Sequence, residues 1–506
     1  GGLFAMADPV REHARRHVAE LPQGPRAFER HARHCLALAQ DATAAAKKGQ
    51  PGPAIDLLRT SAADLDQALA WTRCHADLQT WLHMSWMCAF FQIGFGSHRV
   101  AIELLDAAIE RTARTPGERH FSAMCHVLSA GARALQWDHA VMLKLLRRAR
   151  ALAADSTDED LLHKIDYLTS MVCQQQQRVG AADKVARRMI DRATRSQRAD
   201  HAAAGYICLA AACQFRGDYR RARDAAEQAI AAAQKAQVPT WMVLSHCICA
   251  GSEISLGDLE RAKGSLADGL QLNRVARRAS LEFHLHLHSS VLAFEQGDFD
   301  DCARQLETVR ALCQSYVPRL AIVVDLWREF VLIERGCADG AVILAGLTVR
   351  DFPFDSDFAN TYACTLKYRL QLLATRREWA AALDVVQAIR QLLRRTGNRL
   401  WASWAAESAV VAAQHAGRVA WARRFLELSS ALQARSGSIT TPRQTNSWSR
   451  LGAGLSAFGR DATAPTDAGF DAALASLLQD LGVAADAGAF VVSAAPHDNE
   501  IVIAGA

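Results

Sequence analysis

The sequence predicts an all-α protein built from stacked helical hairpins, an α-solenoid. Two observations carry this prediction. Alanine is abundant, whereas only 12 prolines and 6 tyrosines occur among 506 residues, a composition that favours helix over sheet. A glycine turn also recurs at a fixed interval, with apolar and small residues in register with it. The pattern therefore predicts one repeated helical unit along most of the chain.

Three segments carry the repeat most clearly, and they read FRGDYRRARDAAEQA, SLGDLERAKGSLADG and EQGDFDDCARQLETV. Their glycines, Gly217, Gly257 and Gly297, are separated by two equal intervals. The series continues less regularly in both directions, at Gly96, Trp137, Gly180, Gly336, Arg377 and Gly417. This spacing predicts that each unit is one hairpin of two helices.

Three positions recur after each turn. The second residue is apolar, the fifth is small and the ninth is apolar, as in Tyr219, Ala222 and Ala226 or in Leu259, Ala262 and Leu266. We interpret the glycine as the left-handed end of the first helix and the small residue as the point where the two helices approach closely. One hairpin cannot bury its apolar stripe alone, so neighbouring hairpins must stack.

This pattern resembles the tetratricopeptide repeat, lengthened from ~34 to about 40 residues per unit. The residues that match are Leu209, Ala210, Cys213, Gly217, Tyr219, Ala222 and Ala229. The resemblance implies a right-handed superhelix of about ten hairpins, whose first helices line a concave groove. We expect the repeat array over residues 25–435, preceded by a separate segment at 1–24. Residues 436–506 are expected to form a polar linker, a last helix at 470–481 and a tail.

Composition excludes several classes of function. The 58 basic and 53 acidic residues give a net charge of +5, too small a surplus for a nucleic-acid binder of this length. Basic stretches at 144–150 and 187–188 have helical spacing, so we interpret them as solvated helix faces. The 13 cysteines lie mostly in apolar helical runs, as reduced, buried thiols do in a cytoplasmic protein. No stretch reaches the ~18 apolar residues of a membrane helix.

No motif predicts a catalytic site, a cofactor site or a metal site. Signatures of phosphate-binding loops, serine hydrolases and zinc proteases are missing from the sequence. In EFHLHLHSS, His284 and His288 are four residues apart and could hold a metal, although zinc needs a third ligand. We interpret both histidines as partly buried or groove-lining. We likewise interpret the aromatic cluster TWLHMSWMCAFF at 80–91 as core and inter-repeat packing rather than a cofactor site.

The beginning of the chain, over residues 3–110, resembles the region that follows the nucleotide-binding module in bacterial signal-transduction ATPases with numerous domains (STAND), including MalT-like and AfsR-like transcriptional regulators. Three motifs occur in the same order as in that family. The first is matched by Phe4, Met6, Pro9, Val10, Arg11, Glu12 and Ala14. The second is matched by Arg30, His31, Ala32, Leu36, Leu38 and Ala39. The third is matched in part by Asp64, Leu65, Ala68, Leu69, Ala70 and Trp71.

The resemblance implies that residues 1–24 are the remnant of a winged-helix segment and that an ATPase module precedes it. The repeats would then be a non-catalytic sensor arm that binds a partner protein or a small inducer in the groove. Two alternatives remain open at this point. One is a free-standing tetratricopeptide-like adaptor or chaperone-type scaffold, and the other is an enzyme with a metal at His284 and His288.

Overall fold

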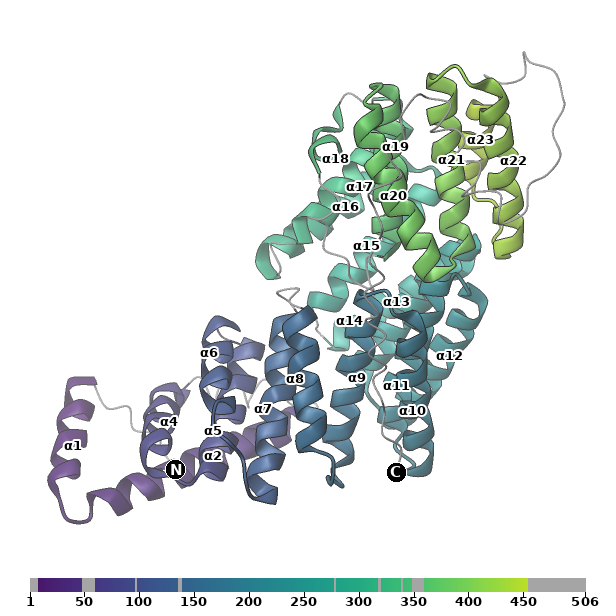
Figure 1. Cartoon of the computed structure of the whole chain (residues 1–506). Helices are drawn as coiled ribbons and strands as arrows, with labels where there is room; N and C mark the ends of the chain where they lie inside the picture. Colours follow the sequence, from purple (N-terminus) through teal and green to yellow (C-terminus); the bar gives the residue numbers. More distant parts are fainter. Residues whose placement is uncertain are drawn as a thin grey trace, which may run out of the picture. The chain divides into compact units, whose positions relative to one another are not determined.

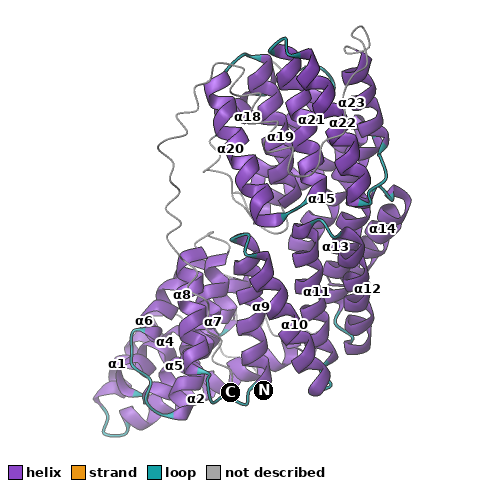
Figure 2. Cartoon of the chain, turned by 45° about the vertical axis from the view of Figure 1, so that its right-hand side comes forward, coloured by secondary structure: helices purple, strands orange, loops and turns teal. Residues whose placement is uncertain are grey.

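A computed structural model describes residues 8–47, 60–95, 98–134, 139–276, 279–316, 320–337, 340–347 and 359–453. The chain divides into two compact units, Gly1–Val172 (unit 1) and Cys173–Ala506 (unit 2). Within the described residues every regular element is a helix and none is a strand, as Figure 2 shows. The predicted all-α class is confirmed. None of these helices combines the length and the apolar character that crossing a lipid bilayer requires.

Unit 1 begins with three helices that precede the regular hairpins (Figure 1): α1 (Asp8–Glu20), α2 (Gly24–Lys47) and α4 (Ala62–His75). The hairpins follow as α5 (Leu78–Phe95) with α6 (His98–Ile109) and α7 (Pro116–Ala134) with α8 (His139–Leu152). The first helix of the next hairpin, α9 (Glu159–Gln175), closes the unit. Apolar side chains of α2, α4, α5 and α6 share one buried core, which includes Cys35, Leu65, Trp81 and Leu105.

Unit 2 continues the same alternation of first and second helices. Its elements are α10 (Val179–Arg195), α11 (Ala199–Arg216), α12 (Tyr219–Ala236), α13 (Pro239–Leu256), α14 (Leu259–Ala276), α15 (Ala279–Gln296), α16 (Phe299–Tyr316), α17 (Ala321–Glu334), α18 (Val342–Gly346), α19 (Ala359–Thr375), α20 (Trp379–Thr396), α21 (Arg399–His415), α22 (Val419–Ser436) and α23 (Pro442–Ala453). Consecutive helices pack as antiparallel hairpins, so the tetratricopeptide-like solenoid is confirmed.

The turns inside the hairpins have the predicted left-handed backbone. Gly217, Gly257 and Gly297 have φ of 75°, 77° and 80°, and Gly336, Arg377 and Gly417 continue the series with φ of 80°, 59° and 70°. The second helices begin two residues after each of these turns except Gly336, where α18 begins at Val342, and the small residues Ala222, Ala262 and Cys302 are fully buried. The proposed role of these positions is therefore confirmed.

One position in the predicted series is wrong. Gly180 lies inside α10, and the left-handed residue of that hairpin is Gln177, with φ of 59°. The interval from Gln177 to Gly217 equals the interval from Gly217 to Gly257, so the spacing in the structure is more regular than the glycines alone suggested. Glutamine tolerates this conformation at a modest cost, and the sequence therefore conceals the turn. Gly96 and Trp137 lie outside the described residues.

Within the described residues, a second series of left-handed residues follows the second helix of four hairpins. Gln197, Gln237, Gly397 and Gly437 have φ of 55°, 54°, 65° and 73°. They too are separated by the repeat interval or by whole multiples of it. The same backbone geometry thus recurs at both ends of the hairpin, although only one end is marked by glycine in most units.

In unit 2, helix α21 contacts α11 and the start of α12, although about five repeats separate them in the sequence. We call this contact the closure of unit 2. Asn398 begins α21 and donates from Nδ2 to the Gln214 carbonyl at 3.2 Å and to the Tyr219 hydroxyl oxygen at 2.9 Å. Phe215 meets Trp401 edge to face, with ring centroids 6.2 Å apart. A Cβ atom on Gly217 would lie 2.6 Å from the Asn398 side chain, so glycine is needed for the approach as well as for the turn.

The predicted linker after residue 435 is wrong in part, because it contains helix α23. Residues 442–453 are helical, and Arg443, Gln444 and Ser447 are buried against the array. Figures 1 and 2 both draw α23 beside α22. The polar sequence of this segment predicts a linker, but its polar side chains contact polar partners elsewhere in unit 2. The motif residues Phe4 and Met6, the predicted helix at 470–481 and the tail lie outside the described residues.

Candidate functional site

Unit 1 contains a cavity of about 260 Å³ along its first helices. Helices α5, α7 and α9 supply its walls, as expected if first helices form the inner face of the array. The lining residues are Trp86, Phe90, Met124, Val127, Leu128, Gly131, Asp158, Asp160, Leu161, Lys164, Tyr167 and Leu168. We call this surface the α5–α9 groove.

The aromatic cluster of α5 is divided between the core and this groove. Trp81 is only 2% exposed and belongs to the core, as predicted. Phe90 instead lines the groove and is 36% exposed, whereas Trp86 reaches the groove wall from the core, is 9% exposed and stacks on Phe90 with ring centroids 5.8 Å apart. Aromatic rings supply a large apolar contact area at a small cost in side-chain entropy. The core interpretation is thus confirmed for Trp81 and Trp86, and it missed only the exposed ring of Phe90.

One rim of the groove is polar. Asp158 caps the start of α9, where its Oδ1 accepts from the Asp160 and Leu161 amides at 2.9 and 3.1 Å. His120 lies 3.7 Å from the same carboxylate. Among the described residues, the lining contains neither serine, cysteine nor histidine. An apolar floor with a charged edge is suited to binding.

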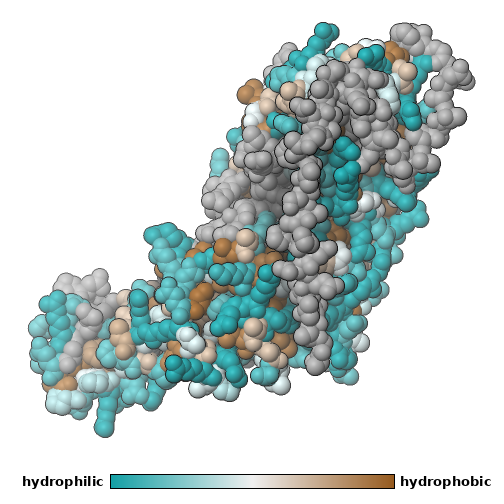
Figure 3. Space-filling model, viewed as in Figure 1, coloured by the Kyte–Doolittle hydropathy of each residue, from teal (hydrophilic) through white to brown (hydrophobic). Residues whose placement is uncertain are grey.

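Figure 3 shows the surface of unit 1 from one side, with brown apolar side chains gathered between teal hydrophilic ones. Three apolar side chains of α7, Met124, Val127 and Leu128, contribute to the groove. Gly131, one turn further along α7, leaves room beside them, because a Cβ atom there would meet only Leu168 Cδ1 at 3.8 Å. The groove can therefore accept an apolar group between α7 and α9.

The two histidines singled out in the sequence lie in unit 2. They line a smaller cavity of about 40 Å³ together with Gln214, Phe215, Leu244, Cys247, Ile248, Gly251, Asn360 and Trp401. His288 Nδ1 lies 2.8 Å from the His284 carbonyl oxygen, to which it donates. Burial lowers the pKa of His288 to about 4; the bond to the carbonyl opposes this shift, and the charge of His284 adds to it. His288 is therefore neutral at pH 7.

A metal at this cavity would require further ligands. His286 lies on another side of α15, where Nδ1 is 3.1 Å from Gln305 Oε1. Among the described residues, no group of three or more histidine, cysteine or acidic side chains is placed to hold a metal ion. Both His284 and His288 lie in the wall of this cavity.

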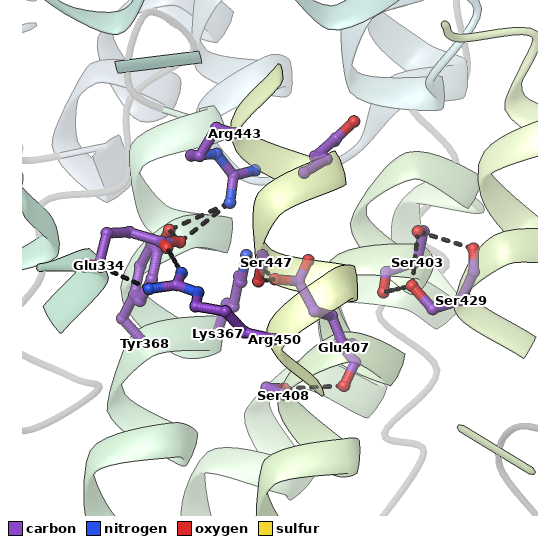
Figure 4. Close-up of polar contacts among 12 residues, drawn as sticks. Glu334, Lys367, Tyr368, Ser403, Glu407, Ser408, Ser429, Arg443, Ser447 and Arg450 are labelled. Carbon is purple, nitrogen blue, oxygen red and sulfur yellow. Dashed lines mark hydrogen bonds and ion pairs between the residues drawn. The ribbon is translucent and has the colours of Figure 1, made fainter. Parts of the chain in front are cut away.

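The inner face of the later repeats in unit 2 is filled by α23. Arg443 lies 3.1 Å from Glu295 and 3.0 Å from Glu334, and Arg450 lies 2.5 Å from Glu334. Figure 4 shows both guanidinium groups directed at the Glu334 carboxylate. Ser447 donates to Glu407 Oε1 at 2.8 Å, and Lys367 reaches the same oxygen at 2.8 Å. We call these residues the α23 network.

The network keeps its central carboxylate ionised. Burial alone would raise the pKa of Glu334, but the charges of Arg443 and Lys367, the Tyr368 hydroxyl and Arg450 outweigh it and lower the pKa to about 2. Tyr368 donates to Glu334 at 2.6 Å, and burial raises the pKa of this phenol well above its usual value. Sequence reasoning missed these residues, because their carboxylates and cations come from five different helices.

Neither a family model nor a curated protein sequence matches this chain. Several solved structures have a similar backbone arrangement. A Rap protein complexed with competence and sporulation factor is 13% identical, with a TM-score of 0.47, over 74% of this chain and 99% of that one. The apo form of RapI is 10% identical, with a TM-score of 0.42, over 76% and 98%.

A STAND protein with a tetratricopeptide-repeat sensor from Pyrococcus horikoshii is 14% identical, with a TM-score of 0.40. The similarity covers 74% of this chain and 56% of that protein. At such identities and scores these likenesses carry no inference about what the chain binds.

Proposed function

We propose that this protein is a non-catalytic interaction module and that the α5–α9 groove binds an apolar segment of a protein partner or an inducer. The cavity of about 260 Å³ on the first helices is the observation that carries the proposal. Binding sites for small molecules and peptide anchors are concave, largely apolar and edged by a few polar groups. The groove has each of these properties.

Trp86 and Phe90 are the expected anchors for the ligand. Stacked aromatic rings at the floor of a groove are typical of the residues that dominate binding energy. The carboxylates and the lysine at the rim, Asp158, Asp160 and Lys164, would select the polar flanks of the ligand. These features fit a short amphipathic segment better than a nucleic acid, since the groove does not gather positive charge.

A cavity-filling variant tests this proposal. Gly131→Leu places an apolar side chain in the groove, and replacing glycine within a helix should not weaken α7. Random displayed peptides are selected on the unaltered protein and then measured against the variant. We expect the selected peptides to share apolar anchors and to bind Gly131→Leu about tenfold or more weakly.

Gly180→Leu is the matched control, because Gly180 is exposed on α10 and has no neighbouring atom within 4 Å of its Cβ position. Peptides should bind this variant as they bind the unaltered protein. Peptide binding that Gly131→Leu leaves unchanged would place the binding surface elsewhere and contradict the proposal.

We further propose that the chain is the sensor arm of a bacterial regulatory ATPase. This rests on the ordered motifs at residues 3–110, whose second and third members coincide with α2 and α4. The coding sequence upstream of Gly1 tests it: a Walker motif within a few hundred codons supports the proposal, and a start codon immediately before Gly1 contradicts it. A start codon there would favour the free-standing adaptor and leave the groove proposal intact.

A further inference from the structure

Helix α23 packs on unit 2 through a polar face. Its buried residues are Arg443, Gln444 and Ser447. Helices that belong permanently to a core are usually buried through apolar side chains, whereas exchangeable interfaces are more polar. The buried residues of α23 are therefore polar, as in an exchangeable binding interface.

The part of the array that faces α23 carries more negative than positive charge. Three of the carboxylates on its first helices contact the side chains of α23 or Lys367 and are buried with α23 in place, Glu295 from α15, Glu334 from α17 and Glu407 from α21. Lys367 of α19 neutralises one of them by pairing with Glu407 at 2.8 Å. Glu295 and Glu334 remain, and the positive charges that face them, Arg443 and Arg450, come from α23.

Buried carboxylates need a paired cation, because an uncompensated charge in the interior is strongly unfavourable. Any segment that covers this face and buries these carboxylates must therefore supply equivalent cations. The contacts of α23 define that segment, since Arg443, Ser447 and Arg450 are spaced i, i+4 and i+7 and share one helical face. Arg443 also stacks over Phe294, with its guanidinium carbon 5.3 Å from the ring centroid.

The fit of α23 is incomplete at its beginning. A small cavity of about 20 Å³ remains where Thr441 and Gln444 face Trp404 of α21 and Gln433 of α22. The Trp404 indole N–H and the Gln433 Oε1 are buried and have no hydrogen-bond partner within the described part of the chain. A buried donor and a buried acceptor without partners are unfavourable, and a better-matched segment could satisfy both.

We propose that the inner face of α15, α17, α19 and α21 is a binding site for a basic helical segment of a partner protein, and that α23 is its built-in occupant. The partner segment carries arginine, a hydroxyl residue and arginine at the spacing Arg-x3-Ser/Thr-x2-Arg. It binds by displacing α23. This site is separate from the α5–α9 groove and does not depend on the function proposed for that groove.

A peptide with the sequence of residues 440–453 tests the site in trans. The labelled peptide is titrated into the full chain and into Arg450→Gln, and its fluorescence anisotropy is measured. Arg450 is the more exposed of the two arginines, so its replacement weakens α23 with the least damage to folding. We expect the peptide to bind Arg450→Gln more tightly than the unaltered chain by about tenfold or more.

The control peptide has glutamine in place of both arginines and should bind either protein about tenfold more weakly or not at all. Hydrogen–deuterium exchange of the unaltered chain supplies a second readout that does not require the variant to fold. Saturating peptide should increase exchange of the backbone amides at 442–453. Equal affinity for both peptides, or unchanged protection of α23 at saturation, would show that α23 is a permanent structural helix and overturn the proposal.

Discussion

The inner faces of the two units differ although both are built from the same hairpins. In unit 1 the first helices present Trp86, Phe90 and apolar residues of α7 to an open groove. In unit 2 the first helices present Glu295, Glu334 and Glu407, and the chain's own α23 covers them. The repeat thus supplies an inner face in both units, and a few side chains on that face determine what occupies it.

Removing one cation from the α23 network should have the largest effect. Arg443→Met leaves Glu295 buried without a cation and removes one of the two arginines paired with Glu334, which costs about 3 to 5 kcal/mol of unfolding free energy. Chemical denaturation measures this loss. Arg304→Met is the matched control, because Arg304 is exposed and pairs with the partly exposed Asp301, so about 0.5 kcal/mol or less is expected. If both variants lost a similar amount of unfolding free energy, the buried ion pairs of Arg443 would contribute no more than the exposed pair of Arg304, and the prediction would be wrong.

The next largest effect should appear as a pH dependence in unit 2. His288 has its pKa lowered from 6.5 to about 4, so the unfolded chain binds its proton more readily than the folded one. The free energy of unfolding therefore does not depend on the protonation of His288 above pH 6.5. It decreases by about 2 to 3 kcal/mol as the pH falls from 6.5 towards 4, because only the unfolded chain takes up the proton in this range. Denaturation of the unaltered chain and of His288→Gln over this pH range measures it. The variant should show a shallower pH dependence, and parallel curves would contradict the assignment.

Breaking the contact between α21 and α11 in unit 2 should lower the free energy of unfolding by a smaller amount. Asn398→Ala removes a cap that accepts from the Leu400 and Trp401 amides at 3.1 and 3.2 Å, and it removes both contacts to α11 and Tyr219. We expect a loss of about 2 kcal/mol. Asp218→Ala removes an exposed cap that makes no such closure, and should cost about half as much. Hydrogen exchange should rise in α11 as well as α21 only for Asn398→Ala.

Filling the groove of unit 1 should have the smallest effect on stability. Gly131→Leu improves helix propensity by up to about 1 kcal/mol and adds apolar contacts in existing space. Thermal denaturation should therefore show an unchanged or slightly raised midpoint, while peptide binding is lost. A lowered midpoint would indicate that the groove is too narrow for an added side chain and would weaken the contrast between the two units.

Much of the fold could be predicted, because its signals are local. The glycine of a left-handed turn, the small residue where two helices meet and the apolar residue that begins a second helix occupy fixed positions within one hairpin. Gln177 shows the limit of that reasoning, since a tolerated substitute carries no visible signal. The α23 segment shows a second limit, because a polar stretch resembles a linker unless its partners are known.

The sequence by itself determined the all-α class, the hairpin and its regular spacing, because these depend on contacts between residues close in the chain. Only the tertiary structure decided which inner face is open and which is filled. Arg443 meets Glu295 across 148 positions of the sequence, and Asn398 meets Tyr219 across 179. No local pattern records such pairs, since superhelical winding brings them together only after many small rotations between repeats have accumulated.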